Sequence, residues 1–274
     1  VNEHIDRLDY AREPMNLYEP VKYILALGGK RIRPVMMLMA YNMYRDDVDK
    51  ILDPALALEI YHNFTLLHDD LMDNADVRRG KPTVHKRWDA NTAILSGDVM
   101  LSLADVYMSR IDDAYFRQVM ATFHQTSIEI AEGQQYDMDF ETKQKVSVVE
   151  YMRMIELKTS VLLAGAVVIG AMLGGASKED CKALRRFAIE LGLAFQLQDD
   201  LLDSYGDERL GKAIGGDILE GKKTYLMITA MSRANEEQRE VLRSTHLDAR
   251  LSRAEKIARV QAVYDELDIP HLTG

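Results

Sequence analysis

Two short segments of this 274-residue sequence carry aspartates in the same pattern, D-D-x-x-D, over residues 69–73 and 199–203. Each segment ends a run of apolar residues at helical spacing. The outer aspartates of each segment are four residues apart and therefore share one helical face, where like charges lower helix stability by about 0.2–0.5 kcal/mol. Because the local rules are broken in the same way twice, we expect function to override stability at both segments.

The outer carboxylates are candidate ligands of a hard divalent cation. Asp69, Asp73, Asp199 and Asp203 offer oxygen atoms, and Mg²⁺ is commonly held by a few carboxylates together with substrate phosphates. The residues after Asp73 do not follow the EF-hand pattern, and a single Glu-x-x-His motif does not supply the two that a di-iron bundle requires. The pattern therefore predicts that two carboxylate clusters hold several Mg²⁺ ions around a diphosphate.

Cations gather beside both aspartate segments. Residues 28–34 read Gly-Gly-Lys-Arg-Ile-Arg-Pro, and residues 78–81, which follow the first segment, read Arg-Arg-Gly-Lys. Lys158 lies at the start of an apolar helix, and the second segment is followed by Lys212, Lys222 and Lys223. Arginine matches phosphate oxygens in bidentate fashion, and lysine supplies a compact charge. This grouping predicts an anionic substrate that carries phosphate groups.

The elements that must position these residues are helices. Apolar residues recur at three- and four-residue spacing over 35–43, 52–71, 90–107, 121–135, 151–172, 178–202 and 223–234. Continuous β-branched runs joined by hairpin dipeptides are missing, and no linker rich in Gly, Ser or Pro divides the chain. We therefore expect an all-α fold of ten or more helices in a single domain over residues 1–274, with its site in the space between helices.

Composition excludes several classes of protein. The chain has 34 Lys and Arg against 44 Asp and Glu, a net charge of −10, which argues against nucleic-acid binding. Its single cysteine, Cys181, excludes an internal disulfide and a cysteine zinc site and fits a reducing compartment. The uncharged run over 159–177 is rich in Gly and Ala and predicts a buried helix rather than a membrane span. We expect a cytoplasmic protein without a signal peptide.

Taken together, these motifs resemble those of the trans-isoprenyl diphosphate synthases of the polyprenyl synthetase family, and the resemblance covers most of the chain. The matching motifs are Gly28-Gly29-Lys30-x-x-Arg33-Pro34, Asp69-Asp70-x-x-Asp73 with Arg78-Arg79-Gly80, Lys158-Thr159, Gln196-x-x-Asp199-Asp200-x-x-Asp203, Gly211-Lys212 and Gly215-Gly216-Asp217. The resemblance implies a helical bundle around a deep central cavity, usually as a homodimer. Compared with most members, we expect the chain to lack a C-terminal helical segment.

The resemblance also implies a reaction and a role for each motif residue. The reaction is the Mg²⁺-dependent head-to-tail (1'-4) condensation of isopentenyl diphosphate with an allylic diphosphate, which releases pyrophosphate. Three Mg²⁺ ions would be held by Asp69, Asp73, Asp199 and Asp203. The allylic diphosphate would contact Arg78, Lys158, Thr159, Gln196, Lys212 and Lys222, and the first three would act in catalysis. Isopentenyl diphosphate would contact Lys30, Arg33, His62 and Arg79.

Product length would depend on the helix that carries the first aspartate segment. Phe64 lies five residues before Asp69, and Tyr61 lies three residues further back, on a related helical face. In the family, a bulky residue at the position of Phe64 closes the pocket for the growing chain. Farnesyl synthases often carry a second aromatic residue where this sequence has Thr65, so we favour a C20 product, with C15 next.

Two other functions remain open. A class I terpene cyclase also uses an aspartate-rich helix and Mg²⁺, but it resembles an N/D-D-x-x-S/T-x-x-x-E pattern at the second segment, where this chain has Asp203. A non-catalytic partner subunit of a synthase tends to lose the aspartate motifs, and both are intact here. The presence of the basic segment around Lys30 also favours the synthase over the cyclase.

Overall fold

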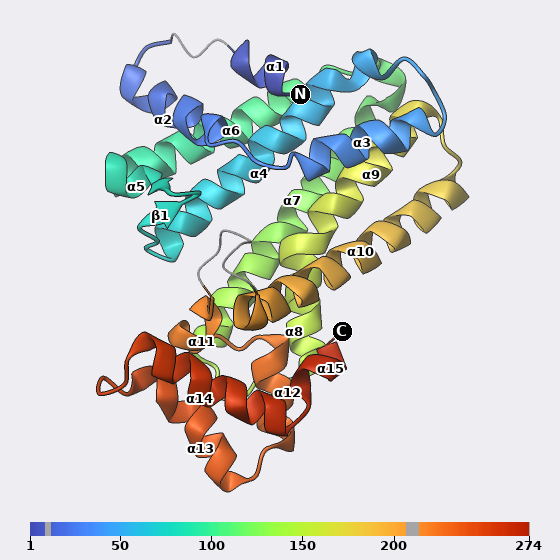
Figure 1. The fold of residues 1–274 in the computed structure, drawn as a ribbon. Helices are drawn as coiled ribbons and strands as arrows, with labels where there is room; N and C mark the ends of the chain where they lie inside the picture. The colour runs from blue at the N-terminus through green and yellow to red at the C-terminus, as the bar shows by residue number, and fades with distance from the viewer. Residues whose placement is uncertain (9–11, 207–213, 274) are drawn as a thin grey trace. The chain divides into compact units, whose positions relative to one another are not determined.

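Helices dominate the computed structural model, which describes residues 1–8, 12–206 and 214–273 (Figure 1). The α-helices are α1 Asn2–Asp6, α2 Met15–Ala26, α3 Ile32–Asn42, α4 Leu52–Met72, α5 Val84–Arg87, α6 Ala90–Met108, α7 Asp113–Thr142, α8 Val148–Ile155, α9 Val161–Gly174, α10 Lys178–Tyr205, α11 Gly216–Glu220, α12 Tyr225–Arg233, α13 Glu236–Ser244, α14 Arg253–Glu266 and α15 Ile269–Thr273. Short 3-10 turns cover Val48–Ile51 (η1) and Thr245–Leu247 (η4). The predicted all-α class is confirmed.

Two local features differ from the periodicity of the sequence. A small antiparallel hairpin pairs β1 (Val77–Arg78) with β2 (Lys81–Pro82) directly after the first aspartate segment. The apolar stretch predicted as one helix over 151–172 contains a π-helical turn, η2 (Glu156–Ser160), between α8 and α9. Both features carry residues that the motifs singled out, which fits the frequent occurrence of π-turns at functional sites.

The chain divides into two compact units. Unit 1 comprises residues 1–125 and 163–185, and unit 2 comprises residues 126–162 and 186–274. The boundaries fall within the long helices α7, α9 and α10. The first aspartate segment belongs to unit 1 and the second to unit 2, so each is described within its own unit.

Helix α4 forms the centre of unit 1 and packs against α6 and α3 (Figure 1). Every residue from Pro54 to Tyr61 is buried, so the helix is enclosed on all sides over its first half. A helix that is buried all round belongs to a core, which explains its weak amphipathic pattern. The second half of α4 leads toward the aspartates at its C-terminal end, so the core fixes the helix that carries them.

Unit 2 contains two apolar clusters that support the second aspartate segment. One is formed mainly by α12 and α14 and includes Leu226, Val260 and Tyr264. The other includes Tyr151 and Met154 of α8. Helix α8 begins with a capping box in which Ser147 and Glu150 bond each other's backbone, and this arrangement satisfies donors that the first helical turn would leave unpaired.

The predicted buried helix is confirmed. Within the described part of the chain, one helical stretch, Val148–Gly174, is long and apolar enough to cross a membrane. However, 83% of its 18-residue apolar window is buried inside the structure. This is the pattern of a core helix. Cys181 is a free thiol of intermediate exposure, as the single cysteine requires.

Candidate functional site

The first aspartate segment ends helix α4, and its three carboxylates have different surroundings. The middle one, Asp70, is buried and accepts hydrogen bonds from Arg78 Nε at 2.8 Å to each of its two oxygens. Burial raises the pKa of Asp70, and the Arg78 guanidinium partly offsets that effect. Asp73 is the exposed C-cap residue, and its backbone N–H donates to the carbonyl of Asp69 at 2.8 Å. The middle carboxylate thus joins the end of α4 to Arg78 of the following hairpin, and the outer pair lies on another face of the helix.

The hairpin after α4 presents the two arginines that the sequence singled out. Arg79 and Gly80 form its turn with φ angles of 51° and 74°, the conformation that a two-residue turn of type I′ requires. Arg78 points back to Asp70, whereas Arg79 Nη1 donates to the carbonyl oxygen of Gly28 in the basic segment before α3. The hairpin therefore connects the first aspartate segment to the basic segment.

A cluster of cations surrounds His62 on α4. Arg33 Nη1 lies 3.0 Å from His62 Nε2, and burial lowers the pKa of Arg33 to about 10. Burial and the nearby guanidinium of Arg33 hold the pKa of His62 well below its usual range, so the imidazole is neutral at pH 7 and can accept a hydrogen bond from Arg33. The Nε atom of Arg33 is buried without a hydrogen-bond partner. A buried guanidinium with an unused donor is suited to an anion.

This cluster brings together much of the predicted isopentenyl diphosphate set. Arg33 contacts His62, Arg79 bonds to Gly28, and Lys30 lies exposed on the same segment between them. Arg31, which the sequence grouped with these cations, behaves differently because its side chain is only 8% exposed and pairs with Glu59 of α4 at 2.5 Å. Spacing alone does not separate this arginine from its neighbours.

The second aspartate segment, on α10 in unit 2, repeats the division of roles with other partners. Asp200 is buried and accepts hydrogen bonds from the Tyr151 hydroxyl, from Gln196 Nε2 at 3.1 Å and from the Tyr225 backbone N–H at 3.4 Å. Burial raises the pKa of Asp200, and these donors oppose the shift. Asp203 accepts the backbone N–H of Asp217 at 3.0 Å, which joins the end of α10 to the start of α11.

Asp217 is a site residue that the sequence analysis quoted in a motif without giving it a role. Burial, followed by the charge of Asp203, raises its pKa to about 7. Lys222 Nζ lies 4.0 Å from its Oδ1 atom and 3.3 Å from Glu220, so the lysine is shared between two carboxylates. Carboxylates that raise each other's pKa are suited to a divalent cation, which would replace the missing positive charge.

No three Asp, Glu, His or Cys side chains of the described residues form a complete metal site on their own. This arrangement fits Mg²⁺, which usually keeps several ligands from water or from substrate phosphates and needs only one or two carboxylates. The oxygen-only donor set also fits a hard cation rather than zinc. Each outer carboxylate could therefore hold a cation together with water or an anionic ligand.

The π-turn η2 positions Lys158 and Thr159. Lys158 Nζ pairs with Asp137 of α7 at 2.6 Å, and the Thr159 hydroxyl donates to Gln196 Oε1 at 3.2 Å. The turn needs glycines on two neighbouring helices. A Cβ atom on Gly133 would overlap the backbone of Lys158, and one on Gly192 would come within 2.6 Å of the Ser160 hydroxyl. Asp137 is a further charged neighbour that helical periodicity did not reveal.

The two residues proposed to limit product length lie in contact. The ring centroids of Tyr61 and Phe64 are 5.5 Å apart, which confirms their related helical faces. Phe64 also packs edge-on against His68 at 4.8 Å, and Tyr61 packs against Phe123 of α7 at 5.3 Å. The result is a continuous aromatic stack one to two turns before the first aspartate segment. Its effect on product length stays a prediction.

Two lysines, Lys212 and Lys222, remain among the residues predicted to contact the allylic diphosphate. Lys222 is exposed beside Asp217, whereas Lys212 lies outside the described residues.

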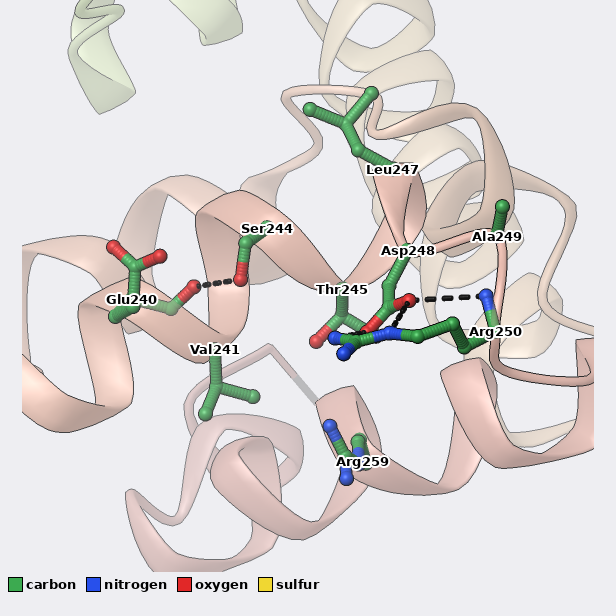
Figure 2. Close-up of a pocket in the computed structure, with 9 residues that line it drawn as sticks. All are labelled: Glu240, Val241, Ser244, Thr245, Leu247, Asp248, Ala249, Arg250 and Arg259. Carbon is green, nitrogen blue, oxygen red and sulfur yellow. Dashed lines mark hydrogen bonds and ion pairs between the residues drawn. The ribbon is translucent and has the colours of Figure 1, made fainter.

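A separate pocket of about 730 Å³ lies on α13, η4 and α14 (Figure 2). It is lined in part by Leu247, Arg250 and Arg259, and none of the predicted site residues line it. Figure 2 shows Arg250 bonded to Asp248, so this pocket offers no unpaired acidic cluster.

Comparison with known proteins identifies the family. The family model for polyprenyl synthetase matches residues 14–267. A geranylgeranyl diphosphate synthase of Methanosarcina mazei is 43% identical over 236 residues, which cover 85% of this chain and 73% of that protein.

Solved structures of similar fold support the same family. The geranylgeranyl pyrophosphate synthetase of Pyrococcus horikoshii OT3 has a TM-score of 0.93 at 33% identity, covering 99% of this chain and 83% of that one. A polyprenyl synthase of Caulobacter crescentus CB15, complexed with calcium and isoprenyl diphosphate, has a TM-score of 0.86 at 30% identity, with coverage of 99% and 83%. Since the family model matches nearly the whole sequence and the fold agrees, the chain belongs to the polyprenyl synthetase family.

Proposed function

We propose that this protein is a prenyltransferase that joins isopentenyl diphosphate to an allylic diphosphate in a head-to-tail (1'-4) condensation and releases pyrophosphate. The observation that carries the proposal is the buried cation cluster, in which Arg33 has an unused donor beside a neutral His62. This cluster is suited to one diphosphate without a metal ion. The crowded carboxylates around Asp217 are suited to a second diphosphate bound through cations.

The residues of the basic cluster would bind and orient isopentenyl diphosphate. Arg33 and Arg79 supply planar donor forks, and Lys30 supplies an exposed point charge. His62 stays neutral between these cations, so it adds hydrogen-bonding capacity without adding further charge. Such positioning converts a reaction between two dissolved molecules into a local one.

The allylic diphosphate would be held by Asp69, Asp73, Asp199 and Asp203 through three Mg²⁺ ions, with Asp217 as an additional carboxylate. When bound, Mg²⁺ supplies charge stabilisation to the departing pyrophosphate. The positive side chains in the predicted set are Arg78, Lys158 and Lys222, with Lys212 beyond the described residues. They would stabilise the same developing negative charge.

The proposed condensation does not require a side-chain nucleophile. The bond between C1 and oxygen of the allylic diphosphate breaks and leaves an allylic cation. The double bond of isopentenyl diphosphate attacks that cation through C4, and a proton then leaves C2. Thr159 and Gln196, bonded to each other at 3.2 Å, would present oxygen atoms to the cation, and the released pyrophosphate would take the proton.

We infer a C20 product, with C15 as the second choice, because Phe64 packs on Tyr61 before the first aspartate segment while Thr65 stands where a second aromatic residue would shorten the pocket. The name of the Methanosarcina mazei relative supports this length. We also propose that the protein acts as a homodimer, which gel filtration with light scattering tests directly.

One incubation separates the candidate functions. The purified protein is mixed with isopentenyl diphosphate, farnesyl diphosphate and Mg²⁺, and the products are resolved by chromatography. Elongation to a C20 diphosphate supports the proposed synthase. A hydrocarbon product would instead support a class I terpene cyclase, and no turnover would support a non-catalytic partner subunit.

A further inference from the structure

In the basic segment over residues 28–34, Arg31 differs from its neighbours because its guanidinium is used in hydrogen bonds within the protein. The Arg31 side chain is only 8% exposed, and it donates hydrogen bonds to Glu59 Oε1 at 2.5 Å, the Leu25 carbonyl at 2.9 Å and Asn2 Oδ1 at 3.2 Å. Arg33, two residues later, has an unused donor instead. The two arginines therefore have different tasks, and Arg31 is not available to a diphosphate.

The partner of Arg31 is equally enclosed. Glu59 has a side chain that is 3% exposed, and its Oε1 atom also accepts a hydrogen bond from Asn63 Nδ2 at 2.9 Å. Glu59 lies three residues before His62 on α4, so the two side chains share a helical face. The ion pair therefore links the basic segment to the same turn of α4 that carries His62.

The backbone at Arg31 requires such a link. Its φ angle of 51° lies in the left-handed region, which costs free energy for a residue with a Cβ atom. The conformation persists only where the surroundings fix it, and here three side-chain hydrogen bonds do so. Because Arg31 lies between Lys30 and Arg33, fixing its backbone sets the direction of both.

Glu59 also supplies the negative charge that the cation cluster needs. Burial lowers the pKa of Arg33 and of Arg79, and the Glu59 carboxylate partly offsets that effect at both guanidinium groups. Without that charge, several guanidinium groups would crowd around His62 with nothing to neutralise them. The Arg31–Glu59 pair thus both fixes the backbone of the basic segment and partly neutralises the cations around His62.

We propose that Arg31 and Glu59 form a positioning pair that holds the basic segment against α4, so that Lys30, Arg33 and His62 converge on the diphosphate of isopentenyl diphosphate. Neither residue touches substrate. The inference rests on the proposed function and deepens it, because it assigns the pair to one of the two substrates. Loss of the pair should therefore weaken isopentenyl diphosphate binding and leave the allylic substrate almost unaffected.

The first test compares Michaelis constants in Glu59→Gln and Arg31→Lys. We expect each to raise KM for isopentenyl diphosphate by about tenfold or more, with KM for farnesyl diphosphate changed less than about twofold. Asp53→Asn is the matched control. Asp53 lies on α4 like Glu59 but forms an exposed pair with Arg110 at 3.3 Å, so the change should leave both constants unchanged.

A second variant separates positioning from simple stability. The double change Arg31→Met with Glu59→Leu replaces a buried ion pair by apolar side chains, which often restores stability. We expect thermal stability close to that of the wild type, with KM for isopentenyl diphosphate still raised. Equal changes in both Michaelis constants, or recovery of isopentenyl diphosphate binding in the double variant, would overturn the inference. A wild-type protein that does not elongate farnesyl diphosphate would instead overturn the proposed function and the inference with it.

Discussion

The two aspartate segments share a sequence pattern but satisfy their buried middle carboxylate in opposite ways. In unit 1, Asp70 is paired with a cation, Arg78, through two hydrogen bonds of 2.8 Å. In unit 2, Asp200 is surrounded by neutral donors from Tyr151, Gln196 and Tyr225. The first segment therefore carries its own counter-charge, whereas the second leaves more negative charge for an external cation to neutralise.

The largest expected effect comes from the outer carboxylates, which we propose as cation ligands in both units. We expect Asp69→Asn and Asp199→Asn each to lower kcat by about 10²–10³-fold, since each removes charge stabilisation of the leaving group. Steady-state rates at saturating Mg²⁺ measure this. Thermal melts serve as the control for folding. A loss of less than about tenfold in either variant would remove that carboxylate from the metal-binding set.

Asp217 provides a pH test that applies to unit 2. Its pKa of about 7 in the folded chain lies above its usual value, so between about pH 4 and pH 7 the folded state binds more protons than the unfolded state. The free energy of unfolding of the metal-free protein should therefore fall as pH rises through this range, by about 3 kcal/mol. Urea titrations at several pH values measure the slope. Asp217→Asn should flatten it, and an unchanged slope in that variant would contradict the assignment.

Smaller effects separate the two middle aspartates. Asp70→Asn leaves Arg78 without its counter-charge and should lower the free energy of unfolding by about 2–3 kcal/mol. Asp200→Asn keeps an acceptor for Tyr151 and relieves repulsion with its neighbours, so its cost should be about 1 kcal/mol or less. Urea denaturation of both variants at pH 7 makes the comparison. An equal cost would mean that the two segments do not differ as described.

Product length is the mildest change and concerns unit 1 alone. We expect Phe64→Ala to open the aromatic stack and lengthen the main product by about one isoprene unit without abolishing activity. Chromatography of the dephosphorylated products measures this. Phe116→Ala removes an exposed ring from α7 and serves as the control, with no change in length expected. An unaltered product from the Phe64 variant would assign that ring to core packing.

Much of the fold was predictable because it depends on helical periodicity. The stretches over 52–71 and 90–107 match α4 and α6 within a residue at each end. Periodicity could not reveal the π-turn at Glu156–Ser160, since it depends on how closely Gly133 and Gly192 approach from other helices. The small hairpin after α4 was missed because strands of two residues leave no alternating pattern.

The site was predictable only as far as residue types in a motif specify a ligand. The outer aspartates and Arg33 stand out by spacing. The tasks of Arg31 and Glu59 depend on burial and on a contact between residues 28 apart, which no local pattern encodes. Asp217 and Asp137 were overlooked for the same reason, because each gains its significance from a charged neighbour elsewhere in unit 2.

Calorimetric titration with and without Mg²⁺ tests the central claim most directly, namely that one diphosphate is bound by cationic side chains and the other through carboxylate-held metal. The ligands are isopentenyl diphosphate and a non-hydrolysable allylic thiolodiphosphate. We predict that isopentenyl diphosphate binds without Mg²⁺ and loses affinity in Arg33→Met, whereas the allylic analogue binds only with Mg²⁺ and loses affinity in Asp199→Asn. Equal dependence of both ligands on Mg²⁺, or competition of both for one site, would contradict the claim.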